Sequence, residues 1–198
     1  MTTEMADFRG DLRWVHNREG HAGRVYWPGG SSGLTIDPGV DLGHAPPNLI
    51  EKAYGPVLRP NELAAIKTML GVKGVVAKMA LADSDVLQGI QISAETAARV
   101  FAVVVIPYWR LLVSRFPALS GNGVPGCVHT AMLSLAYNRG AFNRDLSPLG
   151  VPITRGDWHA LADIIGRMQQ DHQLPGIRKR RRAEAQLIRD GLPRIPTR

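Results

Sequence analysis

The sequence has few or none of several features, and each shortage excludes a class of protein. Its 198 residues include one cysteine, Cys127, which excludes an intramolecular disulfide and a zinc site built from cysteines alone. The longest apolar run, Val100 to Ile106 with its neighbours, is about half of the roughly 20 residues that a membrane-spanning helix needs. Four acids interrupt the first twenty residues, so no secretory signal peptide is visible. We therefore expect a soluble protein that is made in a cytoplasm and stabilised by burial of apolar side chains.

Acidic residues are also fewer than basic residues. The chain has 24 lysines and arginines against 17 acids, which gives a formal net charge of +7. Such a surface attracts nucleic acid, anionic lipid and acidic cell-wall polymers alike, so the charge does not choose among these partners. Hydrophobic residues make up 44% and charged residues 21%, close to the average of globular proteins. A disordered or fibrous chain is excluded, and the length fits one ordinary domain.

The spacing of apolar residues predicts a mostly helical chain with one short β region. Apolar residues that step by four and three predict a first helix from about Ala6 to Glu19. Between residues 24 and 43, β-favouring segments alternate with Gly- and Pro-rich turns, which predicts a small antiparallel sheet of two or three strands. Pro107 should kink or divide a long helix. The remaining helices are predicted at Asn61 to Leu70, Val75 to Leu81, Ser93 to about Arg115, Val128 to Asn138, Asp157 to His172 and Gly176 to Asp190.

Two acids of this region have unlike surroundings. Glu19 would end the first helix on its core-facing side, where desolvation and the negative end of the helix dipole disfavour a carboxylate, so we expect it to hold a proton. Asp41 lies among turns and short strands, where backbone N–H groups and water favour the ionised form. One proton-holding acid and one ionised acid are the groups that glycoside hydrolysis uses. Thr35, six residues earlier, would share a strand face with Asp41 and place its hydroxyl beside the same water.

The residues around these acids resemble the active-site region of phage-type lysozymes of glycoside hydrolase family 24, and in particular its pesticin-like branch. In that branch a Glu-Gly pair ends the first helix, and a Ser-Gly-x-Thr-Ile-Gly-x-Gly-x-Asp-Leu-Gly block follows. This chain has Glu19-Gly20 and then SGLTIDPGVDLG at residues 32–43, with Asp37 in place of a usual Gly and Pro38 stiffening the same turn. The segments 134–140 and 176–184 resemble two further blocks of the family, in the same order.

The resemblance implies an α+β, lysozyme-like fold over residues 1–198 as a single catalytic domain, with a mostly helical body, a small antiparallel β lobe at about residues 24–43 and a cleft between them. It implies a muramidase that hydrolyses the β-1,4 bond between N-acetylmuramic acid and N-acetylglucosamine in peptidoglycan. Glu19 would be the general acid, Asp41 the carboxylate that activates water, and Thr35 its helper. In the two later blocks, Asn138 would lie behind the substrate cleft and Arg180 would pair with the catalytic glutamate.

The same resemblance implies a setting for this activity. It suggests a bacteriolytic phage endolysin that is made in the host cytoplasm and acts on the cell wall in the periplasm, with peptidoglycan glycan strands as its partner. No cofactor and no metal are implied, and we expect a monomer. Among the aromatic residues, Tyr26 and Trp27 are the best candidates for sugar platforms, because they lie close in sequence to the expected cleft.

Other interpretations of these residues stay open. Glu19 and Asp41 could be a solvated helix end and a turn residue, as in a catalytically idle peptidoglycan-binding relative. The basic run from Arg178 to Arg182 is either a solvated helix face with Arg180 turned inward or a contact for anionic wall polymer or lipid, as in a cationic membrane-active protein. No module that reads nucleic acid is visible. The spacing of five between His16 and His21 does not fit the paired histidines of a zinc protease helix.

Overall fold

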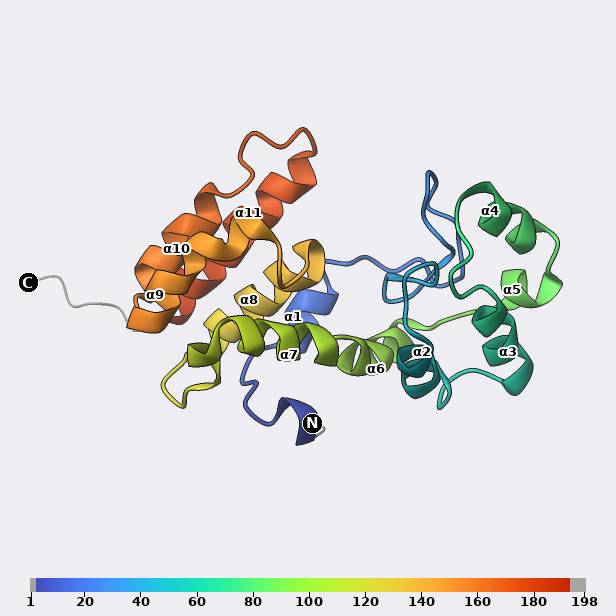
Figure 1. Cartoon of the computed structure of the whole chain (residues 1–198), viewed down its shortest axis with the longest axis horizontal. Coiled ribbons are helices and arrows are strands. Elements are labelled where there is room, and N and C mark those ends of the chain that lie inside the picture. The colour runs from blue at the N-terminus through green and yellow to red at the C-terminus, as the bar shows by residue number, and fades with distance from the viewer. Residues whose placement is uncertain (1–2, 193–198) are drawn as a thin grey trace, which may run out of the picture. The chain divides into compact units, whose positions relative to one another are not determined.

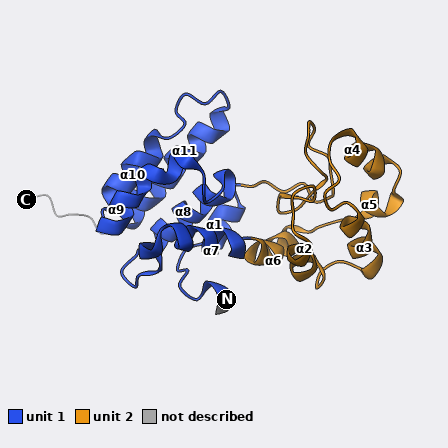
Figure 2. Cartoon of the chain, in the orientation of Figure 1, with its two compact units in different colours: residues 1–18, 105–198 blue, residues 19–104 orange. Residues whose placement is uncertain are grey.

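The chain forms two compact units in its computed structural model, which describes residues 3–192. Unit 1 combines residues up to 18 with those from 105 onward, and unit 2 is the continuous segment 19–104 between them (Figure 2). The chain therefore enters unit 2 between Arg18 and Glu19 and leaves it between Val104 and Val105. The predicted β region is part of unit 2, together with several helices.

The regular secondary structure of unit 1 is entirely helical within its described residues. It contains a short 3₁₀ helix η1, the helices α1, α7 and α8, two further 3₁₀ helices, and the helices α9 to α11 (Figure 1). Their bounds are η1 Thr3–Met5, α1 Leu12–His16, α7 Ile106–Arg115, η2 Pro117–Ser120, α8 Gly126–Arg139, η3 Arg144–Leu149, α9 Gly150–Arg155, α10 Trp158–Arg167 and α11 Pro175–Gly191.

Helix α8 forms the centre of unit 1. Every residue from 128 to 136 is buried, and α1, α7 and α11 all pack against this helix. A helix that is covered on all sides cannot show the one-sided apolar pattern of a surface helix. Helices α10 and α11 then pack along each other on the outside of this core (Figure 1). The arrangement places the buried Ser134 of α8 against Glu184 of α11.

Unit 2 holds the small sheet and five helices. The strands are β1 Thr35–Ile36 and β2 Val40–Asp41, which pair antiparallel. The helices are α2 Pro47–Tyr54, α3 Pro60–Thr68, α4 Gly74–Ala82, α5 Asp85–Gly89 and α6 Ala94–Val104. The strand residue Ile36 is fully buried, as are Ile50 and Tyr54 of α2, and α2 packs against α6. The hairpin is therefore anchored on the helical core of its own unit.

The described fold is mostly helical with a two-stranded antiparallel sheet, which confirms the α+β class and the expected small sheet. Six helical regions also lie where the spacing predicted them, and the long one is divided at Val105, two residues before Pro107. The prediction missed α2, α5 and α9, which are short helices of five to eight residues. Because such helices have only one or two turns, the periodic spacing of their apolar residues is too short to recognise.

The extent of the first helix was predicted wrongly. It was expected from about Ala6 to Glu19, whereas α1 begins after the N-cap Asp11, whose carboxylate accepts the Trp14 N–H, and ends at His16. The backbone at Gly10 is packed too closely for a side chain, because a Cβ there would lie 2.6 Å from the Phe8 ring and 2.7 Å from the Thr130 hydroxyl. The backbone before Asp11 is packed against α8 and does not continue the helix.

One helical stretch of the described residues, Ala94–Arg115, is long and apolar enough to cross a membrane by length and composition. It consists of α6 and α7, and 44% of its apolar window is buried inside the protein. Core helices of soluble proteins have the same length and composition, so this stretch by itself is weak evidence for a membrane span.

Candidate functional site

The hairpin of unit 2 brings three of the predicted site residues into one row. Thr35 of β1 lies directly opposite Asp41 of β2. On its other side, Thr35 exchanges two backbone hydrogen bonds with Tyr26, of 2.7 and 3.0 Å. Directly opposed residues of antiparallel segments point to the same face. Tyr26, Thr35 and Asp41 therefore form a row on one sheet face, called here the hairpin row.

Two glycines fix the Asp41 carboxylate. Its Oδ1 accepts the N–H of Gly33 at 3.0 Å and that of Gly43 at 2.8 Å. A Cβ at Gly33 would lie 2.6 Å from this oxygen and 2.3 Å from the Gly43 nitrogen, so only glycine allows the approach. The other oxygen, Oδ2, accepts no hydrogen bond from the described residues, and the side chain is half-buried. One oxygen is thus held in place while the second can orient a water molecule.

Glu19 lies in the turn that follows α1, half-buried and three residues beyond the end of the helix. The expectation that it terminates the first helix is therefore wrong, because α1 ends at His16. Gly20 comes next, with a positive φ of 76° that glycine adopts without strain. The backbone therefore enters the left-handed region directly after Glu19.

Asp37, which departs from the family pattern, is a central residue of this region. The residue is 3% exposed, and its carboxylate accepts the N–H groups of Ala22 at 3.2 Å and Gly23 at 2.5 Å. The Nδ1 atom of His21 lies 2.9 Å from the same carboxylate. The sequence analysis noted Asp37 only as a residue in place of a usual Gly and missed this role. The signal in the sequence was an acid in the turn at Asp37, after a segment with two glycines, Gly20 and Gly23, whose backbone N–H groups it could bind.

The two aromatic candidates have different surroundings. Burial raises the pKa of the Tyr26 hydroxyl, and the charge of Asp37 adds to the rise, so Tyr26 can donate a hydrogen bond at neutral pH. The indole N–H of Trp27 donates to the Ser32 carbonyl at 3.1 Å, which ties this ring to the neighbouring turn. The Lys78 ammonium lies 5.6 Å from the Trp27 ring centroid. Tyr26 belongs to the hairpin row, whereas the Trp27 ring is already in contact with a lysine.

The other two predicted residues, Asn138 and Arg180, belong to unit 1. Asn138 is exposed at the end of α8, and its side-chain oxygen accepts a hydrogen bond of 2.9 Å from Arg181. Arg180 is turned inward, as expected, because its guanidinium contacts the Ser134 hydroxyl at 3.1 Å and the Ser134 carbonyl at 3.2 Å. Its side chain is only 10% exposed. The basic run is therefore not simply a solvated face.

A buried acid accounts for the inward arginines. Glu184 of α11 is fully buried, accepts the Ser134 hydroxyl at 2.6 Å and lies 3.2 Å from Arg181, which is also fully buried. Burial raises the pKa of Glu184, while the Arg181 charge and the Ser134 hydrogen bond oppose the rise. Arg18 adjoins the same cluster, since burial and the Arg180 charge lower its pKa. Sequence analysis missed Arg181 and Glu184, although their spacing of three suits an ion pair on one helix.

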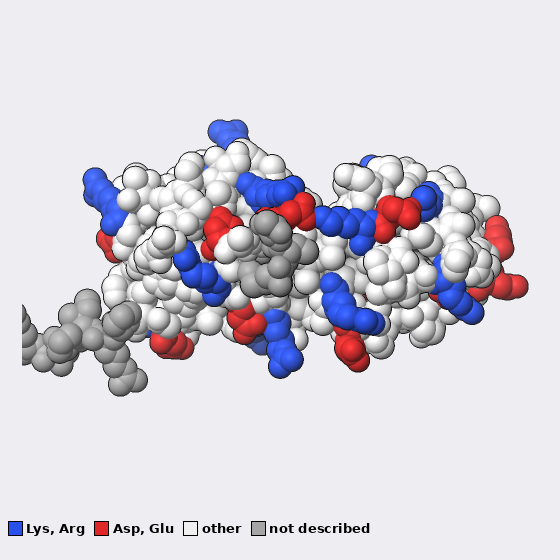
Figure 3. Space-filling view, turned by 90° about the horizontal axis from the view of Figure 1, so that it is seen from below, with Lys and Arg blue, Asp and Glu red and all other residues white. Residues whose placement is uncertain are grey.

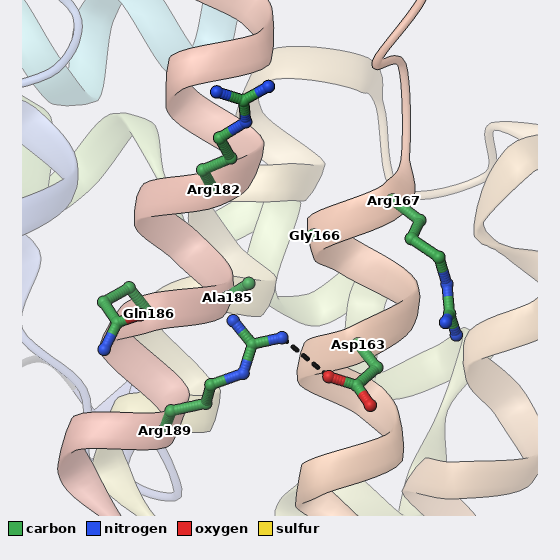
Figure 4. Close-up of a pocket in the computed structure, with 7 residues that line it drawn as sticks. All are labelled: Asp163, Gly166, Arg167, Arg182, Ala185, Gln186 and Arg189. Atoms are coloured by element: carbon green, nitrogen blue, oxygen red, sulfur yellow. Dashed lines mark hydrogen bonds and ion pairs between the residues drawn. The ribbon is translucent and has the colours of Figure 1, made fainter.

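A shallow groove of about 480 Å³ lies between α10 and α11 (Figure 4). Arg189 reaches across it to the Asp163 carboxylate at 2.6 Å, and hydrogen bonding with Arg189 lowers the pKa of Asp163. The floor is made of small residues, because a Cβ at Gly166 would lie 3.3 Å from that of Ala185. Three arginines and one aspartate give the groove an excess of positive charge. It is lined by Asp163, Gly166, Arg167, Arg182, Ala185, Gln186 and Arg189.

On the face drawn in Figure 3, lysines and arginines are interspersed with acids. His21 contacts Asp37, and His44 lies 3.2 Å from the Lys73 ammonium. Within residues 3–192, no group of three or more His, Cys, Asp or Glu side chains could hold a metal ion.

No protein-family model and no curated protein matches this chain.

Proposed function

We propose that this chain is a peptidoglycan muramidase with a lysozyme-like fold, and that it serves as a phage endolysin. The observation that carries the proposal is the hairpin row. An aspartate held by two glycine N–H groups lies opposite a threonine, and the same segment carries the residues that resemble the family 24 block. The Glu19 segment belongs to the same unit. We place the sugar-binding cleft along the hairpin row, with Tyr26 as one of its walls.

In the proposed reaction, Asp41 acts as general base. Its Oδ2 and the Thr35 hydroxyl hold a water molecule, and Asp41 accepts the proton of that water as it attacks the anomeric carbon. Glu19 donates a proton to the leaving glycosidic oxygen. A base that activates water in this way corresponds to inversion of the anomeric centre. No cofactor enters the scheme.

The test is mass analysis of the fragments that the purified protein releases from peptidoglycan. Reducing muramic ends are expected, whereas anhydro ends would indicate a lytic transglycosylase and free stem peptides an amidase. Glu19→Gln and Asp41→Asn should each lower the rate by about 10²–10⁴-fold, the usual contribution of one acid or base group. Asn at position 41 keeps an oxygen for the Gly33 and Gly43 N–H groups, so its melting temperature should stay close to wild type.

Glu95→Gln is the matched control, because this acid is exposed on α6 of the same unit and should leave the rate unchanged. Wild-type protein that binds peptidoglycan without releasing reducing ends would instead support a binding relative. Killing of intact cells that persists in Glu19→Gln would assign that activity to a cationic, membrane-active role.

A second, compatible role is attachment to anionic polymers of the cell wall through the α10–α11 groove. The observation in its favour is the excess of arginine over acid around a floor of small residues. Guanidinium groups suit phosphate and carboxylate ligands. The double variant Arg167→Gln, Arg182→Gln keeps the Arg189–Asp163 ion pair and should weaken binding to insoluble wall at low salt. The control Arg99→Gln, Arg155→Gln removes the same charge from exposed positions elsewhere, and an equal loss there would contradict a role for the groove.

A further inference from the structure

We propose that Asp37 is a positioning residue that holds the Glu19 segment against the hairpin carrying Thr35 and Asp41. The inference rests on the proposed muramidase function, since it concerns the placement of that acid. Asp37 itself touches neither the substrate nor the reacting atoms in this scheme. It acts through the backbone of residues 21–23.

The contacts of Asp37 divide between its two oxygens. Oδ1 accepts the Ala22 N–H at 3.2 Å, and Oδ2 accepts the Gly23 N–H at 2.5 Å and lies 2.9 Å from His21 Nδ1. Asp37 is buried, and its carboxylate would be costly to bury without such donors. All three donors come from the segment directly after Glu19-Gly20. The carboxylate is therefore a clamp between two parts of the chain that are 14 to 16 residues apart.

The hairpin end of this clamp is itself fixed. The backbone carbonyl of Asp37 accepts a hydrogen bond of 2.8 Å from the hydroxyl of Tyr54, a fully buried residue of α2. At the other end, the Gly23 carbonyl accepts the Ile92 N–H at 2.9 Å. The clamp thus joins the segment after Glu19, the hairpin and α2 within one unit. Its partners on both sides are part of a packed structure.

The two glycines that follow Glu19 explain why the segment needs the contacts of Asp37. Gly20 and Gly23 both have positive φ, of 76° and 71°, and a segment with two such residues is flexible unless other contacts hold it. Glu19 is three residues from Ala22, so its Cα lies within about 11 Å of a backbone group that Asp37 holds. A displacement of about 1 Å of a reacting group can lower a catalytic rate about 100-fold. Fixing residues 21–23 therefore limits where the acid can lie.

The charge of Asp37 also reaches the hairpin row, since it contributes to the raised pKa of Tyr26. This electrostatic effect is separate from the hydrogen bonds to residues 21–23. Asp37 also follows strand β1 directly, two residues after Thr35 of the hairpin row.

The experiment uses Asp37→Asn in the full chain. Asn retains one acceptor oxygen and replaces the other with a donor, so it cannot accept from both sides. We expect kcat on soluble glycan strands to fall about 10- to 100-fold with KM within about twofold of wild type. Hydrogen exchange should become faster at the Ala22 and Gly23 amides, while the amides of α8 keep their protection.

Asp83→Asn is the matched control, because this exposed acid lies at the end of α4 in the same unit and should change neither quantity. If Asp37→Asn does not fold, His21→Ala removes one donor, keeps both backbone bonds and should give a smaller fall in kcat with faster exchange at residues 21–23. Wild-type kcat and exchange in the folded variant, beside an inactive Glu19→Gln, would overturn the positioning role alone. Wild-type protein that releases no muramic ends would overturn the proposed function and this role together.

Discussion

His129 shows how one residue can couple the stability of unit 1 to pH. Its ring is fully buried on α8, where Nδ1 accepts the Arg9 N–H at 2.9 Å and Nε2 lies 2.9 Å from the Leu119 carbonyl. These partners assign the proton of the neutral ring to Nε2. Burial is the main cause that lowers the pKa of His129 below its ordinary value of 6.5. The folded state therefore favours the uncharged ring.

This arrangement predicts a loss of stability in acid. Because the pKa is lower in the folded than in the unfolded state, the contribution of His129 is fully present above about pH 6.5 and decreases as the pH falls from there toward the folded pKa. His129→Gln should lower stability at pH 7.5 and flatten the dependence between pH 7 and pH 5, as measured by urea unfolding. His159→Gln, at an exposed position, is the control. An equal pH dependence in wild type and His129→Gln would contradict the assignment.

At the scale of elements, the contact between α8 and α11 depends on a buried polar cluster. Ser134 of α8 donates to Glu184 of α11, and Arg181 of α11 reaches back to Asn138. Nearby, a Cβ at Gly191 would lie 2.6 Å from the Cys127 sulfur, so the helices approach closely where glycine allows it. Hydrogen-bonded charges and close backbone packing thus fix the same pair of helices. Because the charges are buried, their cost is offset only while every partner is present.

We therefore expect Glu184→Ala to be strongly destabilising. Removal of the carboxylate takes away the charge that lies 3.2 Å from the buried Arg181 guanidinium, which should cost about 3–5 kcal/mol in unfolding free energy. The double variant Arg181→Met, Glu184→Leu removes both charges and keeps the volume, so it should recover most of this loss. Chemical denaturation of the three proteins measures both effects. A double variant no more stable than Glu184→Ala would show that packing, not charge, dominates the contact.

At the scale of the whole molecule, the first residues complete a unit whose other part comes after residue 104. Phe8 is 2% exposed and packs edge-on against Trp109 of α7, with ring centroids 4.9 Å apart. The indole N–H of Trp109 donates to Asp7 at 2.9 Å, and the Asp11 N–H donates to Thr130 at 2.7 Å. Unit 1 is therefore assembled from both ends of the described chain, with unit 2 as an insertion.

Phe8→Ala should consequently destabilise helices that are more than a hundred residues away in sequence. Truncation of a buried phenylalanine usually costs about 3–5 kcal/mol. Hydrogen exchange of the α8 amides should accelerate together with a fall in the midpoint of denaturation. Phe142→Ala is the control, because this ring is 59% exposed and its removal should change stability by less than about 0.5 kcal/mol. Protection of α8 that survives Phe8→Ala would contradict this dependence.

The sequence was informative wherever a local pattern carries the structure. The helices α3, α4, α8 and α11 lie close to their predicted bounds, because apolar spacing over several turns is a local property. Thr35 and Asp41 were expected on one face from their even spacing. They do share a face, but through pairing across the hairpin, since a turn separates them.

The tertiary structure decided what depends on distant partners. By itself, the sequence determined the helical content, the position of the small sheet and the candidates Glu19, Thr35 and Asp41. Only the folded chain showed the end of α1 at His16, the clamp formed by Asp37 and the burial of Arg181 against Glu184. Hydrogen bonds and ion pairs of this kind join residues from different elements, and a pattern along the chain contains no information about which elements meet. Desolvation acts in the same way, because the burial of a charge is set by everything that packs around it.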